Sequence, residues 1–140
     1  MIYVDTSALL PVFIREPKSD AVLGWLESSG ERLAISEWSL VEFASAVAIK
    51  VRAGQAAANL AKQATARVRE FAQKHCTVAV PGREEFRRAA ELAGDGALNL
   101  RAGDALHLAI AERLSARGIL CLDDALTASA KSLGMNVVTV

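Results

Sequence analysis

Short, wholly apolar segments separated by longer segments of helical spacing restrict the fold of this chain more than any other feature. Five of these segments have the length of a β-strand, and they occupy residues 2–4, 33–35, 77–80, 119–122 and 137–140. A strand without a polar face must be covered on both sides, and a parallel sheet between two layers of helices provides that cover. The pattern predicts an α/β, three-layer fold with a central parallel sheet of four to five strands flanked by helices.

Helical periodicity fills the intervals between the predicted strands. Apolar residues recur at helical spacing in 18–29, 39–52, 55–75, 83–93, 102–117 and 124–133. A glycine follows each of the first two segments, Gly30 and Gly54, as is common at helix ends. We expect the long segment 55–75 to pair with 39–52 as a projecting helical hairpin.

Length and composition limit the class of protein. The 140 residues fit a single domain, 1–140, and 52% hydrophobic with 23% charged residues is typical of a packed globular chain. Sixteen basic residues balance sixteen acidic ones, so a nucleic acid or other polyanion would have to be bound by local positive charge. No segment approaches the roughly 20 apolar residues of a membrane span, and the N-terminus lacks the basic region of a signal peptide. We therefore expect a cytoplasmic protein with no membrane partner.

The two cysteines, Cys76 and Cys121, are far apart and neither belongs to a C-x-x-C motif. Each has apolar neighbours in the sequence. We expect reduced, packed thiols in preference to a disulfide or a zinc site.

Acidic residues follow two of the predicted strands, where parallel sheets usually bind their ligands. Asp5 follows the first strand, and Asp123 and Asp124 follow the fourth. Two further carboxylates, Glu42 and Asp104, have apolar neighbours within predicted helices. We expect these helices to pack at the same edge of the sheet, which would bring the acids together.

Each of these acids also has a purely structural explanation. Asp5 and Asp123 precede helical segments and could act as N-caps. Ser39 and Glu42 fit the S-x-x-E capping box, and Asp104 lies in the first turn of a helix, where negative charge is favourable. Convergence separates the two interpretations, because four caps need not lie together, whereas four ligands of one site must.

A cluster of carboxylates in a partly buried cleft requires a cation, since like charges raise one another's pKa values. Oxygen ligands suit Mg²⁺ or Mn²⁺. Such an ion lowers the pKa of a bound water, orients it toward phosphorus and stabilises the leaving oxygen. The acids therefore favour phosphate chemistry in which the protein supplies no nucleophile.

Four segments of the chain resemble, in order and spacing, those of the PIN-domain ribonucleases. They read V-D-T-S-A-L, S-L-V-E-F, R-A-G-D-A-L-H-L-A-I-A and L-C-L-D-D-A-L. In size the chain resembles the VapC toxins of type II toxin–antitoxin systems. The resemblance covers essentially the whole chain and implies a PIN-like three-layer fold, with a parallel sheet between helices.

The resemblance also implies an activity, a metal and partners. It matches the four acids of the family to Asp5, Glu42, Asp104 and Asp123, which would bind Mg²⁺ or Mn²⁺ and drive endonucleolytic hydrolysis of RNA to a 3′-hydroxyl and a 5′-phosphate. Asp5 and Asp104 are the strongest candidates for direct ligands. A VapB-type antitoxin that covers the cleft and a homodimeric state are further implications.

Hydroxyl and imidazole groups near the acids have alternative roles. Thr6 and Ser7 could orient the Asp5 carboxylate or a water bound to the metal, or could cap the following helix locally. His107 lies one helical turn from Asp104, and we favour a packing or hydrogen-bond network role for it over that of a general base.

The choice of residue is open at the remaining positions of the site. We take Asp123 as the fourth acid, because it matches the motif and follows the strand, and Asp124 as a charge at a helix start. Many relatives have Thr or Ser two residues before this acid, where this chain has Cys121, a weaker hydrogen-bonding group. Among the basic residues, Arg101 is best placed to contact RNA, because it lies close to Asp104.

Two other functional classes fit the sequence less well. A haloacid-dehalogenase-like phosphotransferase would need a second Asp two residues after Asp5, where this chain has Ser7. A catalytically silent PIN-like module that binds RNA or protein would normally have lost acids, and this chain retains all four. We therefore predict a metal-dependent endoribonuclease toxin.

Overall fold

The computed structural model describes residues 1–140 and contains one sheet of five parallel strands. The strands are β1 (Ile2–Val4), β2 (Leu33–Ser36), β3 (Cys76–Ala79), β4 (Gly118–Leu120) and β5 (Val137–Val138). They lie in the order β3-β2-β1-β4-β5, with the wholly buried β1 at the centre. The predicted α/β fold with a parallel sheet is confirmed.

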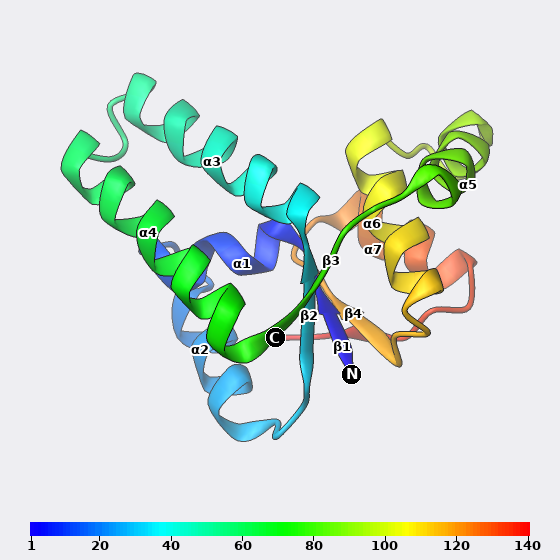
Figure 1. The fold of residues 1–140 in the computed structure, drawn as a ribbon, viewed down its shortest axis with the longest axis horizontal. Helices are drawn as coiled ribbons and strands as arrows, with labels where there is room; N and C mark the ends of the chain where they lie inside the picture. Colours follow the sequence, from blue (N-terminus) through cyan, green and yellow to red (C-terminus); the bar gives the residue numbers. More distant parts are fainter.

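Seven helices connect the strands and form two layers around the sheet (Figure 1). The helices are α1 (Thr6–Phe13), α2 (Ser19–Ser28), α3 (Glu37–Arg52), α4 (Ala58–His75), α5 (Arg83–Gly94), α6 (Ala102–Arg113) and α7 (Asp124–Ser132). Helices α1 to α4 cover one face, and α5 to α7 cover the other. None of them has the combination of length and apolar character that a membrane-crossing helix requires.

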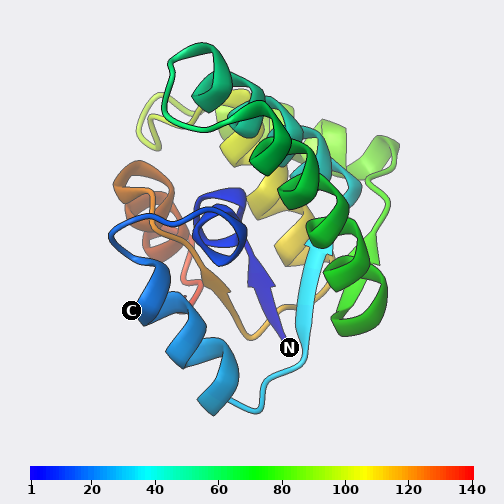
Figure 2. The same ribbon diagram turned by 90° about the vertical axis from the view of Figure 1, so that its left-hand side faces the viewer.

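The side chains of β1 point alternately to the two faces of the sheet, and the hydrophobic core lies in two parts, one on each face. Ile2 and Val4 face the layer of α1 to α4, whereas Tyr3 faces α5 and α6. The arrowheads of β1 and β2 point to the same edge of the sheet (Figure 2), so the residues that follow these strands share that edge.

Helices α3 and α4 form the expected hairpin, which projects from the body of the molecule (Figure 1). Its base is fixed to α1 through Phe13, whose ring packs edge-on against Phe43 and Phe71 at centroid distances of 5.7 Å each. The hairpin therefore has a defined position relative to the sheet edge that carries the acids.

Two sequence-based interpretations are wrong in detail. Helix α3 begins at Glu37, two residues earlier than predicted, so its capping box pairs Ser36 with Ser39 and not Ser39 with Glu42. Strand β4 ends at Leu120, so Asp123 does not follow it directly. The backbone N–H of Leu122 donates instead to Ser7 Oγ at 2.9 Å, which takes this segment out of the sheet.

Both cysteines are free and lie in largely apolar surroundings. Burial raises the pKa of each thiol to about 11. Neither is activated as a nucleophile, because a thiol with such a pKa is protonated near neutral pH.

Candidate functional site

The four acids predicted from the sequence line one pocket at the carboxyl edge of the sheet. The pocket has a volume of about 430 Å³, and among its lining residues are Asp5, Thr6, Ser7, Glu42, Arg101, Asp104 and Asp123. The acids come from four different elements: the end of β1, the second turn of α3, the first turn of α6 and the start of α7. The four acids therefore converge on one pocket, an arrangement that helix capping alone does not require.

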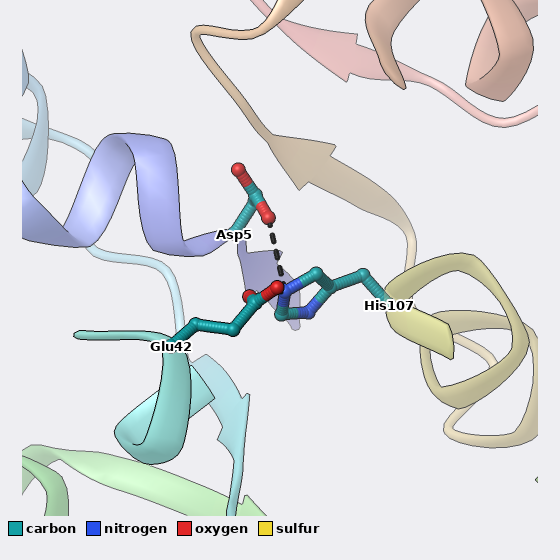
Figure 3. Close-up of side chains that lie close together, drawn as sticks. All are labelled: Asp5, Glu42 and His107. Atoms are coloured by element: carbon teal, nitrogen blue, oxygen red, sulfur yellow. Dashed lines mark hydrogen bonds and ion pairs between the residues drawn. The ribbon is translucent and has the colours of Figure 1, made fainter. Parts of the chain in front are cut away.

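Asp5 uses its carboxylate oxygens in different ways. Oδ2 caps α1 by accepting hydrogen bonds from the Ser7 backbone N–H (2.9 Å) and from Ser7 Oγ (2.5 Å). Oδ1 lies 3.2 Å from His107 Nε2 (Figure 3). Only 4% of Asp5 is exposed, so its position is fixed by these contacts. The capping role and a functional role are compatible.

Glu42 extends from α3 toward the same point (Figure 3). Its Oε2 accepts hydrogen bonds from Thr6 Oγ1 at 2.8 Å and from His107 Nε2 at 2.5 Å. Burial raises the pKa of Glu42, but the hydrogen bonds from His107 and Thr6 lower it by more, so the carboxylate is held ionised.

His107 is fully buried in α6 and joins the acids to the core. Its Nδ1 lies 2.8 Å from the Tyr3 hydroxyl, which in turn lies 2.9 Å from Ser36 Oγ. Burial lowers the pKa of His107, but the hydrogen bond with Glu42 and the charge of Asp5 raise it above its usual range. The hydrogen-bond network role favoured from the sequence is present.

Asp104 and Asp123 form the more open side of the pocket. Asp104 is half-buried and accepts no hydrogen bond from another residue, and burial together with the charges of Asp123 and Asp5 raises its pKa. Asp123 is exposed and caps α7, because its Oδ1 accepts from the Leu126 backbone N–H at 2.8 Å. An unpartnered, half-buried carboxylate beside other acids is a favourable place for a cation.

Three residues close in sequence to Asp104 or Asp123 have different surroundings. Asp124 lies outside the acidic pocket, in a depression that also contains Lys18. Arg101 is exposed immediately before α6 and is the single basic residue among those that line the pocket. Cys121 Sγ lies 3.3 Å from the Asp123 backbone nitrogen, within hydrogen-bonding range for sulfur, so the thiol still contacts the loop that carries this acid.

Sequence reasoning missed three contributors to the site. Tyr3 reads as an ordinary strand residue, although its hydroxyl supports His107. Gly103 leaves room for Glu42, because a Cβ at this position would lie 2.7 Å from Glu42 Oε1. Trp38 Nε1 is buried near the same point and helps to lower the pKa of Glu42, although it makes no hydrogen bond of normal geometry. The glycine next to Asp104 was the available signal, since such a residue often marks a close approach.

Ligand-type atoms of Asp5, Glu42 and His107 all lie within 4.8 Å of one another. This trio is compact enough for a metal ion, but His107 Nε2 is already hydrogen-bonded to Glu42 and lies 3.2 Å from Asp5 Oδ1. The carboxylates of the more open side, Asp104 and Asp123, add oxygen donors at the same pocket.

Comparison with known proteins relates the whole chain to one group. The family model described as PIN domain matches residues 2–132. Ribonuclease VapC46 of Mycobacterium tuberculosis is 33% identical over 141 residues, which span 98% of this chain and 95% of that protein.

Solved structures share the fold at lower identity. VapC20 of Mycobacterium tuberculosis, described as a sarcin-ricin loop cleaving toxin, superimposes with a TM-score of 0.75 at 16% identity and covers 92% of this chain and 95% of its own. A toxin–antitoxin complex from Klebsiella pneumoniae gives a TM-score of 0.68 at 18% identity, with 99% of this chain and 97% of that chain covered.

Proposed function

Because this chain belongs to the PIN-domain family, with VapC toxins as its relatives, we propose that it is a metal-dependent endoribonuclease toxin, neutralised by a cognate VapB-type antitoxin. The observation that carries the proposal is the convergence of four carboxylates from four elements on one pocket. The relative at 33% identity is named a ribonuclease, which supports hydrolysis of RNA as the reaction.

The donor set of the pocket fits Mg²⁺ or Mn²⁺. All four acids offer oxygen, which these ions prefer, and the half-buried Asp104 has no partner in the protein to balance its charge. Asp5 and Asp104 would bind the ion directly, with Asp123 and Glu42 completing the carboxylate set. When bound, the ion would supply Lewis-acid activation of a water and stabilisation of the leaving oxygen.

The other residues would position these ligands and the substrate. Ser7 fixes Asp5 by two hydrogen bonds, and Thr6 fixes Glu42 by one. Arg101, exposed at the pocket, would pair with an RNA phosphate and so hold the negatively charged substrate near the acids. Local positive charge is needed because the chain as a whole has no net charge.

Partners follow from the same family. A structural neighbour is a toxin–antitoxin complex, which supports an antitoxin partner for this chain. Asp123 and Arg101 at the pocket are exposed to solvent, so an antitoxin segment could reach and cover it. We propose in addition a homodimer that acts in the cytoplasm.

The test is cleavage of RNA by the purified protein at several concentrations of Mg²⁺ and Mn²⁺, with EDTA as the control. We expect endonucleolytic products with 3′-hydroxyl ends that require the metal and disappear when the antitoxin is added. A protein that binds its antitoxin but cleaves no RNA under any of these conditions would instead be a silent PIN-like binding module.

A further inference from the structure

A chain of buried polar side chains lies behind the carboxylates. His107 Nδ1 contacts the Tyr3 hydroxyl at 2.8 Å, that hydroxyl contacts Ser36 Oγ at 2.9 Å, and Ser36 Oγ lies 3.1 Å from Ser39 Oγ. All four residues have no measurable exposure. Burying polar groups costs stability unless each one is satisfied, so a fully connected network at this place fixes His107 with little freedom.

The partners of the other imidazole nitrogen determine where its proton lies. Nε2 lies 2.5 Å from Glu42 Oε2 and 3.2 Å from Asp5 Oδ1. A carboxylate can only accept a hydrogen bond, so Nε2 must be the donor, both in the neutral imidazole and in the imidazolium. A nitrogen that bears a proton has no lone pair for a metal ion.

Glu42 is held from a second side as well. Thr6 donates to the same Oε2 at 2.8 Å, while Oε1 lies where a Cβ at position 103 would be only 2.7 Å away. The carboxylate is therefore restricted by two donors on one oxygen and by the backbone of α6 near the other.

We propose that His107 is a positioning residue that donates its Nε2–H to Glu42, faces Asp5 with the same group, fixes these two acids relative to each other and does not bind the metal. The inference rests on the proposed function in that it assumes a metal at the carboxylates. The alternative is a metal bound by Asp5, Glu42 and His107 together, which their separation of less than 4.8 Å would also permit.

Nitrogen-15 NMR of the imidazole rings separates the two arrangements without any measurement of activity. The chain has two histidines, and the exposed His75 on α4 serves as the internal reference. We expect His107 to carry a proton on Nε2 in metal-free buffer and to keep it when Mg²⁺ is added. An unprotonated Nε2 in the free protein, or loss of that proton on addition of Mg²⁺, would overturn the proposal.

Kinetics of three variants give the second readout. Removing a group that orients a metal site typically costs about 10–100-fold, so we expect His107→Phe to lower kcat by that factor with little change in KM for RNA. His107→Gln keeps an N–H that can reach Glu42 and should stay within about tenfold of the wild type. His75→Gln is the matched control and should be unchanged. Wild-type kcat in His107→Phe, or equal losses in both variants at position 107, would contradict positioning through a donated hydrogen bond.

Thermal melting first establishes that His107→Phe is folded. If His107→Phe is not folded, Tyr3→Phe is used in its place, because this change removes only the hydroxyl that contacts His107 Nδ1. A lower kcat in Tyr3→Phe would support the proposal, and an unchanged kcat would contradict it. Failure of the proposed function would appear differently, as a wild-type protein that cleaves no RNA, and the NMR result would still decide the position of the proton.

Discussion

Asp5 combines two roles that sequence reasoning treats as alternatives. One of its oxygens caps α1 while the other faces His107, and Asp123 similarly caps α7 while it lines the pocket. A carboxylate that is already fixed by backbone N–H groups loses little further freedom when it binds a ligand. Acids that cap helices at the carboxyl edge of a parallel sheet are therefore well suited to a site that must be rigid.

Asp104→Asn tests the least-compensated carboxylate. Loss of the charge should lower RNA cleavage by about 100-fold or more, since this acid is a proposed direct ligand. Burial and the nearby Asp123 and Asp5 raise the pKa of Asp104, so the ionised form is less favourable in the folded than in the unfolded state. The melting temperature in EDTA should therefore stay the same or rise slightly. Asp124→Asn, outside the pocket, is the matched control, and equal losses in both variants would argue against the site.

Gly103→Ala tests the close approach of α6 to Glu42. The added Cβ would lie 2.7 Å from Oε1, so the carboxylate must move. A displacement of this kind should lower the cleavage rate by about 10–100-fold. Gly24→Ala is the control, because nothing lies within 4 Å of that position on α2 and a helical Gly→Ala change should stabilise the fold by about 0.5–1 kcal/mol. Unchanged cleavage in Gly103→Ala would show that Glu42 need not keep its place.

At the scale of elements, an ion pair joins the start of α5 to the end of α6. Glu85 accepts a hydrogen bond from the Gly82 backbone N–H at 2.5 Å and forms an ion pair with Arg113 Nε at 2.5 Å. The Gly82 N–H and the Arg113 guanidinium hold the pKa of Glu85 below its usual range. The stabilisation is therefore present above the pKa of the unfolded chain and is lost as the pH falls through the lower pKa of the folded state.

Glu85→Gln should accordingly lower the melting temperature at pH 7, and the difference from the wild type should shrink below about pH 4. Melting curves across this range provide the measurement. Glu84→Gln is the control from the same turn, because its exposed pair with Arg87 contributes little. A difference that is independent of pH would mean that the charge of Glu85 is not what stabilises the junction.

The order and type of the elements could be predicted from the sequence, because strands with two apolar faces leave few alternatives to a covered parallel sheet. The residues at which these elements begin and end could not be predicted. The sequence pattern predicts a strand at residues 121 and 122, but the Leu122 N–H donates its hydrogen bond to Ser7 Oγ and not to a neighbouring strand. The acids were found because they follow strands or interrupt apolar helices, whereas Tyr3 was missed because its partner lies 104 residues away.

At the scale of the whole molecule, a chain of zero net charge gathers four acids and one arginine at a single sheet edge. Repulsion among these acids destabilises the fold, and the network around His107 offsets it for only two of them. The repulsion that is not offset lies at Asp104 and Asp123. Binding of a cation there should therefore be visible in global stability as well as in catalysis.

Added Mg²⁺ should raise the melting temperature of the wild type. A ligand that binds only the folded state stabilises it by about 2.7 kcal/mol at 100 times its dissociation constant. Simple screening by salt would also relieve repulsion, so the comparison requires NaCl at the same ionic strength. We expect a larger rise with Mg²⁺ than with NaCl in the wild type, and no such difference in Asp104→Asn. Equal effects of the two salts on the wild type would mean that the pocket responds to ionic strength alone and holds no specific ion.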